Sequence, residues 1–312
     1  MSGKLNTKNL NLTKKEIKRF FNDDLIKLDI QKVSLSSTNN FNFEIYKDLK
    51  VKNLDIKSNI DLHNLELKNS LKLKKIFPKI KKDLIFKNQK IELKYKKNNL
   101  NIIGEGETLL QNEVDKIKYE VNKKKNEIQF ITKLRISKNP FKLDILNYKK
   151  SKDSNLEINF EGTSNVNKKL KFDKISLKEK KNVISIENLT LSKDLKINEI
   201  GNINISYIDQ DGLKNNLKLI KQDSNYLVSG NSFNLNTIID KLLNSENNNK
   251  FELFNKNFKI IFDVEKIYLD KNNSIKSLKG FLFLVKNKIS ELNLESKFSN
   301  QENIKFTIKN NN

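Results

Sequence analysis

Apolar and polar residues alternate with a period of two along most of this chain. In residues 156–161, for example, Leu156, Ile158 and Phe160 alternate with polar residues. The same alternation recurs in residues 91–95, 202–208, 258–265, 292–298 and 304–308. Because successive side chains of a β-strand point to opposite faces, these segments predict strands with one apolar and one solvated face. Such strands are typical of antiparallel sheets.

Short polar segments separate the alternating runs and predict hairpin turns. They are Asp211-Gly212, Asn98-Asn99, Asn272-Asn273 and residues 286–288. Gly, Asn and Asp are the residues that tight hairpin turns favour. Hairpins of about 20–25 residues therefore recur along the chain. The apolar positions change from even to odd numbers near Asn188, which predicts a β-bulge or a bend near that residue.

Two segments have the residue spacing of helices instead. Thr13 and Glu16 have the spacing of a capping box, which predicts a short helix that begins after Thr13. In residues 235–244 the apolar residues recur at helical spacing and form one apolar face. Asn234 or Asn236 is expected to cap this second helix.

Together these elements predict a mainly β protein. We expect a long, twisted antiparallel sheet that forms an open groove from repeating hairpins, with one or two short helices. Few segments are apolar on both faces. The apolar face of the sheet must therefore pack on a second sheet, on a few helices or on an apolar ligand. Residues 1–60 are expected to form an N-terminal β piece with a short helix, and residues 61–312 the β-groove region.

The net charge of +23 first indicates a nucleic-acid or anionic-membrane partner. However, the chain has no Ala, and Arg19 and Arg135 are its two arginines. Lys and Asn have A/T-rich codons, so an A/T-rich genome accounts for much of the lysine content. The lysines are also dispersed, and Arg is the residue that makes bidentate base and phosphate contacts. Specific nucleic-acid binding is therefore not expected, and non-specific binding is a less favoured alternative.

The residues that carry most enzyme chemistry are scarce. Cys is absent and His63 is the one histidine, so the sequence offers no disulfide, no thiolate metal site and no cysteine nucleophile. Asp209 to Gly212 resembles the start of a calcium loop, but positions 6 and 12 are Lys214 and Ile220, so a hairpin turn is expected. The Gly-Glu-Gly-Glu segment at residues 104–107 favours a strand end or a bulge. We predict a non-enzymatic protein with no catalytic residues, no metal and no cofactor.

The order of elements in residues 200–310 carries a family resemblance. An alternating strand from Gly201 to Tyr207 leads to Asp209-Gln-Asp-Gly212, and residues 226–230 precede the leucine-rich helical segment. A later strand ends in Ile267-Tyr-Leu269, and the last hairpin ends in Glu-Leu-Asn-Leu. This order resembles the C-terminal region of the AsmA-like envelope proteins of Gram-negative bacteria, in particular the YhdP branch. Residues 76–200 fit the same pattern more loosely.

This resemblance implies a role in lipid transport. The AsmA-like proteins are similar to bridge-type lipid-transfer proteins, in which an apolar β-groove shields acyl chains while phospholipid moves between the inner and outer membranes. It implies a periplasmic, envelope-associated location, with phospholipid acyl chains and a membrane or a membrane-anchored chain as partners. From strand parity, the residues expected to line the groove are Ile203, Ile205, Tyr207, Phe258, Ile260, Phe262, Val264, Leu292 and Leu294. Ordinary sheet packing is the alternative role for each, and a structural or adhesin-like β-protein is the alternative function.

The chain departs from the family at its N-terminus. Family members carry an N-terminal membrane helix, whereas the longest apolar run here is residues 281–285. A transmembrane helix needs about 20 apolar residues, and the N-terminus lacks the apolar segment of a signal peptide. The sequence therefore predicts neither a membrane anchor nor an export signal.

Overall fold

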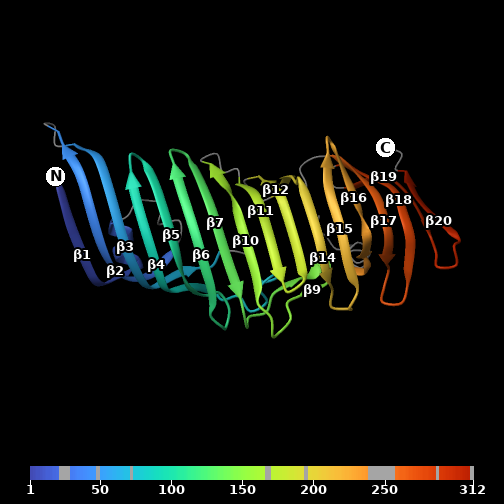
Figure 1. The fold of residues 1–312 in the computed structure, drawn as a ribbon, viewed down its shortest axis with the longest axis horizontal. Coiled ribbons are helices and arrows are strands. Elements are labelled where there is room, and N and C mark those ends of the chain that lie inside the picture. The colour runs from blue at the N-terminus through green and yellow to red at the C-terminus, as the bar shows by residue number, and fades with distance from the viewer. Residues whose placement is uncertain are drawn as a thin grey trace. The chain divides into compact units, whose positions relative to one another are not determined.

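The fold consists of two compact units that are built almost entirely of strands. The computed structural model describes residues 1–20, 29–46, 50–70, 73–165, 170–192, 196–237, 257–285 and 288–309. Unit 1 consists of Met1–Phe141 and Ser151–Val166, and unit 2 of Lys142–Lys150 and Asn167–Asn312. Figure 1 labels their strands along the chain. The division expected at residue 60 falls inside a strand, Val51–Lys68, so the structure divides elsewhere.

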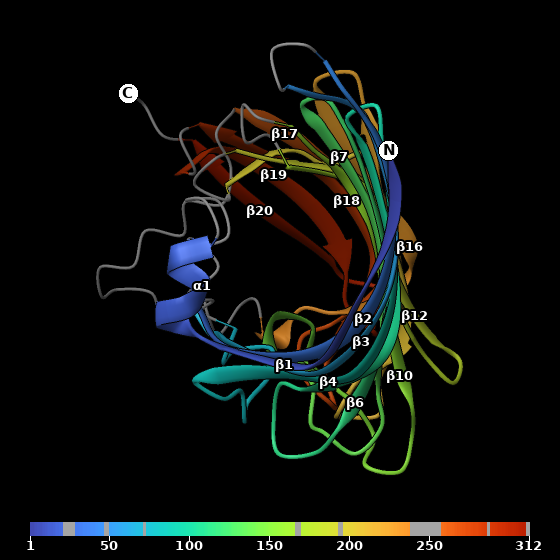
Figure 2. The same cartoon turned by 90° about the vertical axis from the view of Figure 1, so that its left-hand side faces the viewer.

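Unit 1 contains one antiparallel sheet in which nearly every strand pairs with the next in the chain. Its strands are β1 (Ser2–Thr13), β2 (Ile30–Ile45), β3 (Val51–Lys68), β4 (Asp83–Lys96), β5 (Asn99–Leu109), β6 (Asp115–Lys124), β7 (Glu127–Ile136) and β10 (Leu156–Asn165). β10 pairs with β7. The other outermost strand, β1, pairs with β2, and the sheet is open. Figure 2 shows that β1 to β4 bend along their length.

Unit 2 contains a second meander with one parallel step. Its strands are β11 (Leu170–Glu179), β12 (Asn182–Leu191), β13 (Ile197–Glu199), β14 (Asn202–Ile208), β15 (Lys214–Gln222), β16 (Asn225–Asn234), β17 (Phe258–Tyr268), β18 (Ser274–Val285), β19 (Lys288–Lys297) and β20 (Asn303–Lys309). β16 and β17 pair in parallel, and the other neighbours pair antiparallel. A small hairpin of β8 (Lys142–Leu143) and β9 (Tyr148–Lys149) encloses the 3₁₀ turn η1 (Asp144–Leu146).

The predicted fold class is confirmed: the protein is mainly β, with open, mostly antiparallel sheet built from hairpins. At the predicted bulge or bend, Asn188 adopts a left-handed φ of 54°, while the β11–β12 register stays unchanged from Phe172–Leu189 to Lys174–Glu187, so the backbone bends there without an inserted residue. The β4–β5 turn is one residue earlier than predicted. Lys96 pairs with Asn99, and Lys97 and Asn98 form the turn with φ values of 49° and 63°. Of the turn predicted at residues 286–288, residues 286–287 lie outside the described residues.

The first predicted helix is α1 (Lys14–Phe20). The Thr13 backbone N–H donates to the Glu16 carboxylate at 2.8 Å, which is the reach-back bond of a capping box. The second predicted helix falls mostly outside the described residues. At its expected start, the Asn234 side-chain oxygen accepts a hydrogen bond from the Asn236 N–H at 3.0 Å, as a capping residue does.

Gly280 in β18 allows a close approach to the neighbouring strand. Its φ is +131°, and a Cβ at this position would lie 2.0 Å from the Asn293 backbone oxygen. We expect Gly280→Ala to lower the free energy of unfolding by about 2–4 kcal/mol, measured by urea denaturation, because backbone must move to admit the methyl group. Gly212→Ala is the control, since its φ of +80° leaves space around the Cβ. It should cost only about 1 kcal/mol, and equal losses would contradict the steric argument.

Candidate apolar binding face

One face of the unit 2 sheet is apolar from β14 to β20. Residues paired across neighbouring strands lie on the same face of a sheet, so the register of the strands identifies its members. One register row consists of Ile203, Leu219, Val228, Phe262, Gly280, Leu294 and Phe306. A second row consists of Ile260, Leu282, Leu292 and Ile308. We call this surface the unit 2 apolar face.

All nine residues predicted from strand parity lie on the unit 2 apolar face. Tyr207, Phe258 and Val264 are buried, at 2%, 7% and 1% exposure. The other six are half-buried, namely Ile203, Ile205, Ile260, Phe262, Leu292 and Leu294. Val264 packs in a cluster that includes Phe233, so it is part of the hydrophobic core of the unit. Five of these six pack against buried apolar clusters, and all six keep part of their surface exposed.

The β20 end of the unit 2 apolar face is not covered in the described residues. Two packed sheets bury the side chains between them in a core about 10 Å thick. Here Phe306 and Ile308 remain 44% and 40% exposed. Apart from the two main meanders, the described strands form only the small β8–β9 hairpin. The half-buried side chains are therefore consistent with an open apolar surface.

Unit 1 has an apolar face of the same kind, which strand parity did not assign to the site. One register row consists of Leu93, Ile102, Val121 and Phe130. These four side chains are half-buried. The Tyr119 ring lies directly over Gly104, where a Cβ would be 2.4 Å from it, and burial raises the pKa of the Tyr119 hydroxyl. The Gly-Glu-Gly-Glu segment thus lies inside β5, opposite an irregularity of β4 between Lys87 and Lys90.

A short segment closes one end of the unit 2 apolar face. This segment, Lys142–Lys150, is here called the strap. Leu146 of the strap packs against the apolar cluster, and its backbone oxygen accepts a hydrogen bond from the Tyr207 hydroxyl at 2.5 Å. The hydroxyl of Tyr148, which is 1% exposed, donates to the Glu179 carboxylate at 2.5 Å. These bonds hold the strap to β11 and β14.

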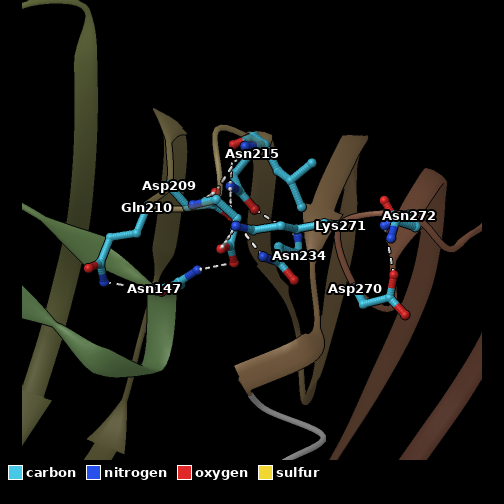
Figure 3. Close-up of polar contacts among 10 residues, drawn as sticks. Asn147, Asp209, Gln210, Asn215, Asn234, Asp270, Lys271 and Asn272 are labelled. Carbon is cyan, nitrogen blue, oxygen red and sulfur yellow. Dashed lines mark hydrogen bonds and ion pairs between the residues drawn. The ribbon is translucent and has the colours of Figure 1, made fainter.

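The β14–β15 turn connects the strap to the sheet through polar contacts (Figure 3). The Asn147 side-chain amide donates to Asp211 at 2.7 Å, and Asp211 also pairs with Lys271 at 3.0 Å. Gln210 donates from its side chain to the Asn147 side-chain oxygen at 3.1 Å. One end of the apolar face is therefore bounded by a polar network.

Asp209 is the centre of that turn and is only 7% exposed. One of its oxygens accepts the backbone N–H groups of Asp211 and Leu213, both at 2.9 Å. The other accepts the side-chain amides of Asn215 at 3.2 Å and Asn234 at 2.8 Å. These four bonds make Asp209 the organiser of a hairpin turn, as predicted. No group of acidic or histidine side chains in the described residues is arranged to hold a metal ion.

A cavity of about 340 Å³ lies at the opposite strand ends of unit 2, and we call it the Lys221 cavity. Its apolar wall includes Tyr226 and Phe258, whose rings meet edge to face with centroids 5.5 Å apart. Its polar wall includes Lys221 and Glu199, which form an ion pair at 2.6 Å. The Glu199 carboxylate raises the pKa of the Lys221 ammonium. Asn198, Asp223, Ser224 and Asn257 line the remaining wall, together with Ile197.

A different depression, of about 620 Å³, lies on the polar face of unit 1. It runs between two register rows of side chains that extend from β3 to β7. Both signs of charge line it, and Lys118 pairs with Glu105 and lowers the pKa of that carboxyl. Because its acidic and basic groups are interleaved, this surface does not present the concentrated positive charge that a nucleic acid would require.

His63 is exposed in β3 and contacts the Ser36 hydroxyl at 3.1 Å.

In the part of the chain that the structure describes, no helix has the length and apolar character needed to span a membrane. Comparisons of the chain with models of known protein families, with curated proteins and with solved structures find no match.

Proposed function

We propose that this protein is a non-enzymatic, AsmA-like carrier whose apolar faces bind the acyl chains of phospholipid. The observation that supports the proposal most is the half-buried apolar face of β14 to β20, in which paired apolar residues follow one another from strand to strand. In this proposal the protein acts in the periplasm, beside a membrane or a membrane-anchored partner chain, and helps phospholipid move between the inner and outer membranes.

The dimensions of the unit 2 apolar face suit an acyl chain. The half-buried row from Ile203 on β14 to Phe306 on β20 crosses six strand spacings of about 4.8 Å, or about 29 Å. The hydrocarbon of one bilayer leaflet is about 15 Å deep, half of a core of about 30 Å. Each buried methylene contributes about 0.8 kcal/mol. An open apolar surface therefore suffices for binding, and no catalytic motif is needed.

A purely structural β-protein should instead cover its apolar side chains within a dry core. The exposure of Phe306 and Ile308 favours the carrier, because a closed core would bury these two residues. The chain does have dry clusters, such as the one around Val264, but they lie beside the strap and at the base of β16 to β18. Ligand binding is proposed for the half-buried region beyond them.

The proposal can be tested by native mass spectrometry of the full chain purified without detergent. We expect at least one phospholipid to co-purify with the chain, and extraction should identify it as a two-chain lipid. Incubation with vesicles should load delipidated protein and restore the same adduct. Protein that stays lipid-free in several preparations, and also after incubation with vesicles, would contradict the proposal.

A further inference from the structure

We propose that the Lys221 cavity is a subsite for the zwitterionic headgroup of a phospholipid whose acyl chains lie on the unit 2 apolar face. The inference rests on the proposed function and adds to it the class of headgroup and its place. It starts from a change of polarity along β15. Leu217 and Leu219 are apolar on this face, and the next residue on the same face is Lys221.

The cavity is continuous with the apolar face. Tyr226 pairs with Lys221 across β15 and β16, and with Ile260 across β16 and β17. Tyr226 and Phe258 belong to one buried cluster, against which Ile203 and Ile260 pack. A ligand with its polar end in the cavity would therefore find apolar side chains as soon as it leaves the cavity along β16 or β17.

The charges of the cavity match a group that carries both signs. The Lys221 ammonium suits a phosphate, and the carboxylates of Glu199 and Asp223 suit an ammonium group beside it. Charge-assisted hydrogen bonds of this kind are stronger than neutral ones. The amides of Asn198 and Asn257 add polar groups to the wall. A purely anionic headgroup would face two carboxylates, so phosphoethanolamine is favoured over phosphoglycerol.

The strap supports this orientation of the lipid. It blocks the other end of the strands with Leu146 and the Tyr207 hydrogen bond. A volume of about 340 Å³ equals about eleven water molecules at about 30 Å³ each. That leaves room for a phosphoethanolamine group with bridging water. The headgroup would thus lie at the end of the face away from the strap.

In the test, the full chain is incubated with vesicles that contain equal amounts of phosphatidylethanolamine, phosphatidylglycerol and diacylglycerol, all with the same acyl chains. Bound lipids are quantified by mass spectrometry after repurification. We expect the wild type to prefer phosphatidylethanolamine to diacylglycerol by about tenfold, the ratio that one charge-assisted contact supplies. Lys221→Met should abolish this preference. The wild type should also prefer phosphatidylethanolamine to phosphatidylglycerol, and Glu199→Gln should abolish that second preference. Lys221→Arg should retain about half or more of the wild-type preference.

Lys218→Met is the matched control, because Lys218 lies on the same strand but on the opposite face. It should keep the wild-type preference. Because the Lys221–Glu199 pair is partly exposed, all variants should keep their melting temperatures within a few degrees. Lipids bound in vesicle proportion by both the wild type and Lys221→Met would overturn this inference while the carrier function stood. Recovery of no lipid at all, diacylglycerol included, would overturn both.

A further arm separates a lipid headgroup from a soluble phosphate compound. Calorimetry of the delipidated chain with inorganic phosphate and with glycerophosphoethanolamine should show binding at least a hundredfold weaker than that of the intact lipid. Binding of either compound as tight as that of the lipid, and lost in Lys221→Met, would assign the cavity to soluble phosphates and overturn the headgroup inference.

Discussion

Replacing Asp209 by alanine should lower the free energy of unfolding of unit 2 by about 3–5 kcal/mol. The carboxylate accepts four hydrogen bonds, two of them from the side chains of Asn215 and Asn234, which are 0% and 3% exposed. A buried donor left without a partner costs about 1–3 kcal/mol. Water can reach some of the vacated space, so the expected loss is below the sum of four such costs. Urea denaturation followed by circular dichroism measures it.

Asp270→Ala is the control for this prediction. Asp270 accepts the backbone N–H groups of Asn272 and Asn273, and the Asn273 side-chain amide, all at 2.7 Å. The bonding resembles that of Asp209, but the donors are exposed, so the loss should be distinctly smaller. A loss as large as that of Asp209→Ala would show that the local turn matters and burial does not.

The Asp270 bonds also predict a dependence on pH. The Asn273 side chain, with the N–H groups of Asn272 and Asn273, lowers the pKa of Asp270 in the folded state. The contribution of the ionised Asp270 carboxylate to the stability of the fold is therefore present above the ordinary aspartate pKa of about 3.9. It is lost as the pH falls through the lower folded-state value. Above about pH 5 the difference between wild type and Asp270→Ala should not change with pH.

The fold was predictable because alternation is a local property of each strand. Ile203, Phe262 and Leu294 could be assigned to apolar faces one strand at a time. The register that aligns them was not predictable, because bulges and pairings far apart in the chain determine it. In β17, for example, Val264 and Ile267 are both buried despite opposite parity, and the facing strand has a left-handed residue at Ser277. At such positions, odd or even numbering along the strand does not predict which side chains are buried.

The strap and the polar network that bound one end of the apolar face could not be predicted from the sequence for a related reason. Asp209 was correctly interpreted as a turn residue, since its contacts to Asp211 and Leu213 are local. Its bond to Asn234 spans 25 residues, and the bond from Asn147 to Asp211 spans 64. Lys221 and Glu199 are likewise 22 residues apart and looked like ordinary surface charges. Only the folded chain places them on the apolar side of the sheet.

Placing two glutamates on the open part of the apolar face should reduce lipid loading by at least about tenfold. Phe306 and Ile308 lie on β20, on the face shared with Leu294 and Leu292. Both are more than a third exposed, so the carboxylates of Phe306→Glu/Ile308→Glu can stay hydrated and the fold should persist. An acyl chain, however, would lose contact with two large apolar side chains beside two charges. Losing the burial of two or three methylenes, at about 0.8 kcal/mol each, corresponds to a factor of about 15 to 60.

The matched control places the same change of charge on the other side of the same strand. Thr307→Glu/Lys309→Gln also alters the net charge by two units, but Thr307 pairs with Asn293 on the opposite face. Lipid loading from vesicles, measured by mass spectrometry at equal protein concentration, should match the wild type in this control. If both double variants lose lipid equally, electrostatic attraction of the whole chain to the vesicle governs loading and the apolar face does not. If both retain it, the acyl chains lie elsewhere, because an accessible apolar surface of this size cannot accept two carboxylates without weakening its hold on a hydrocarbon ligand.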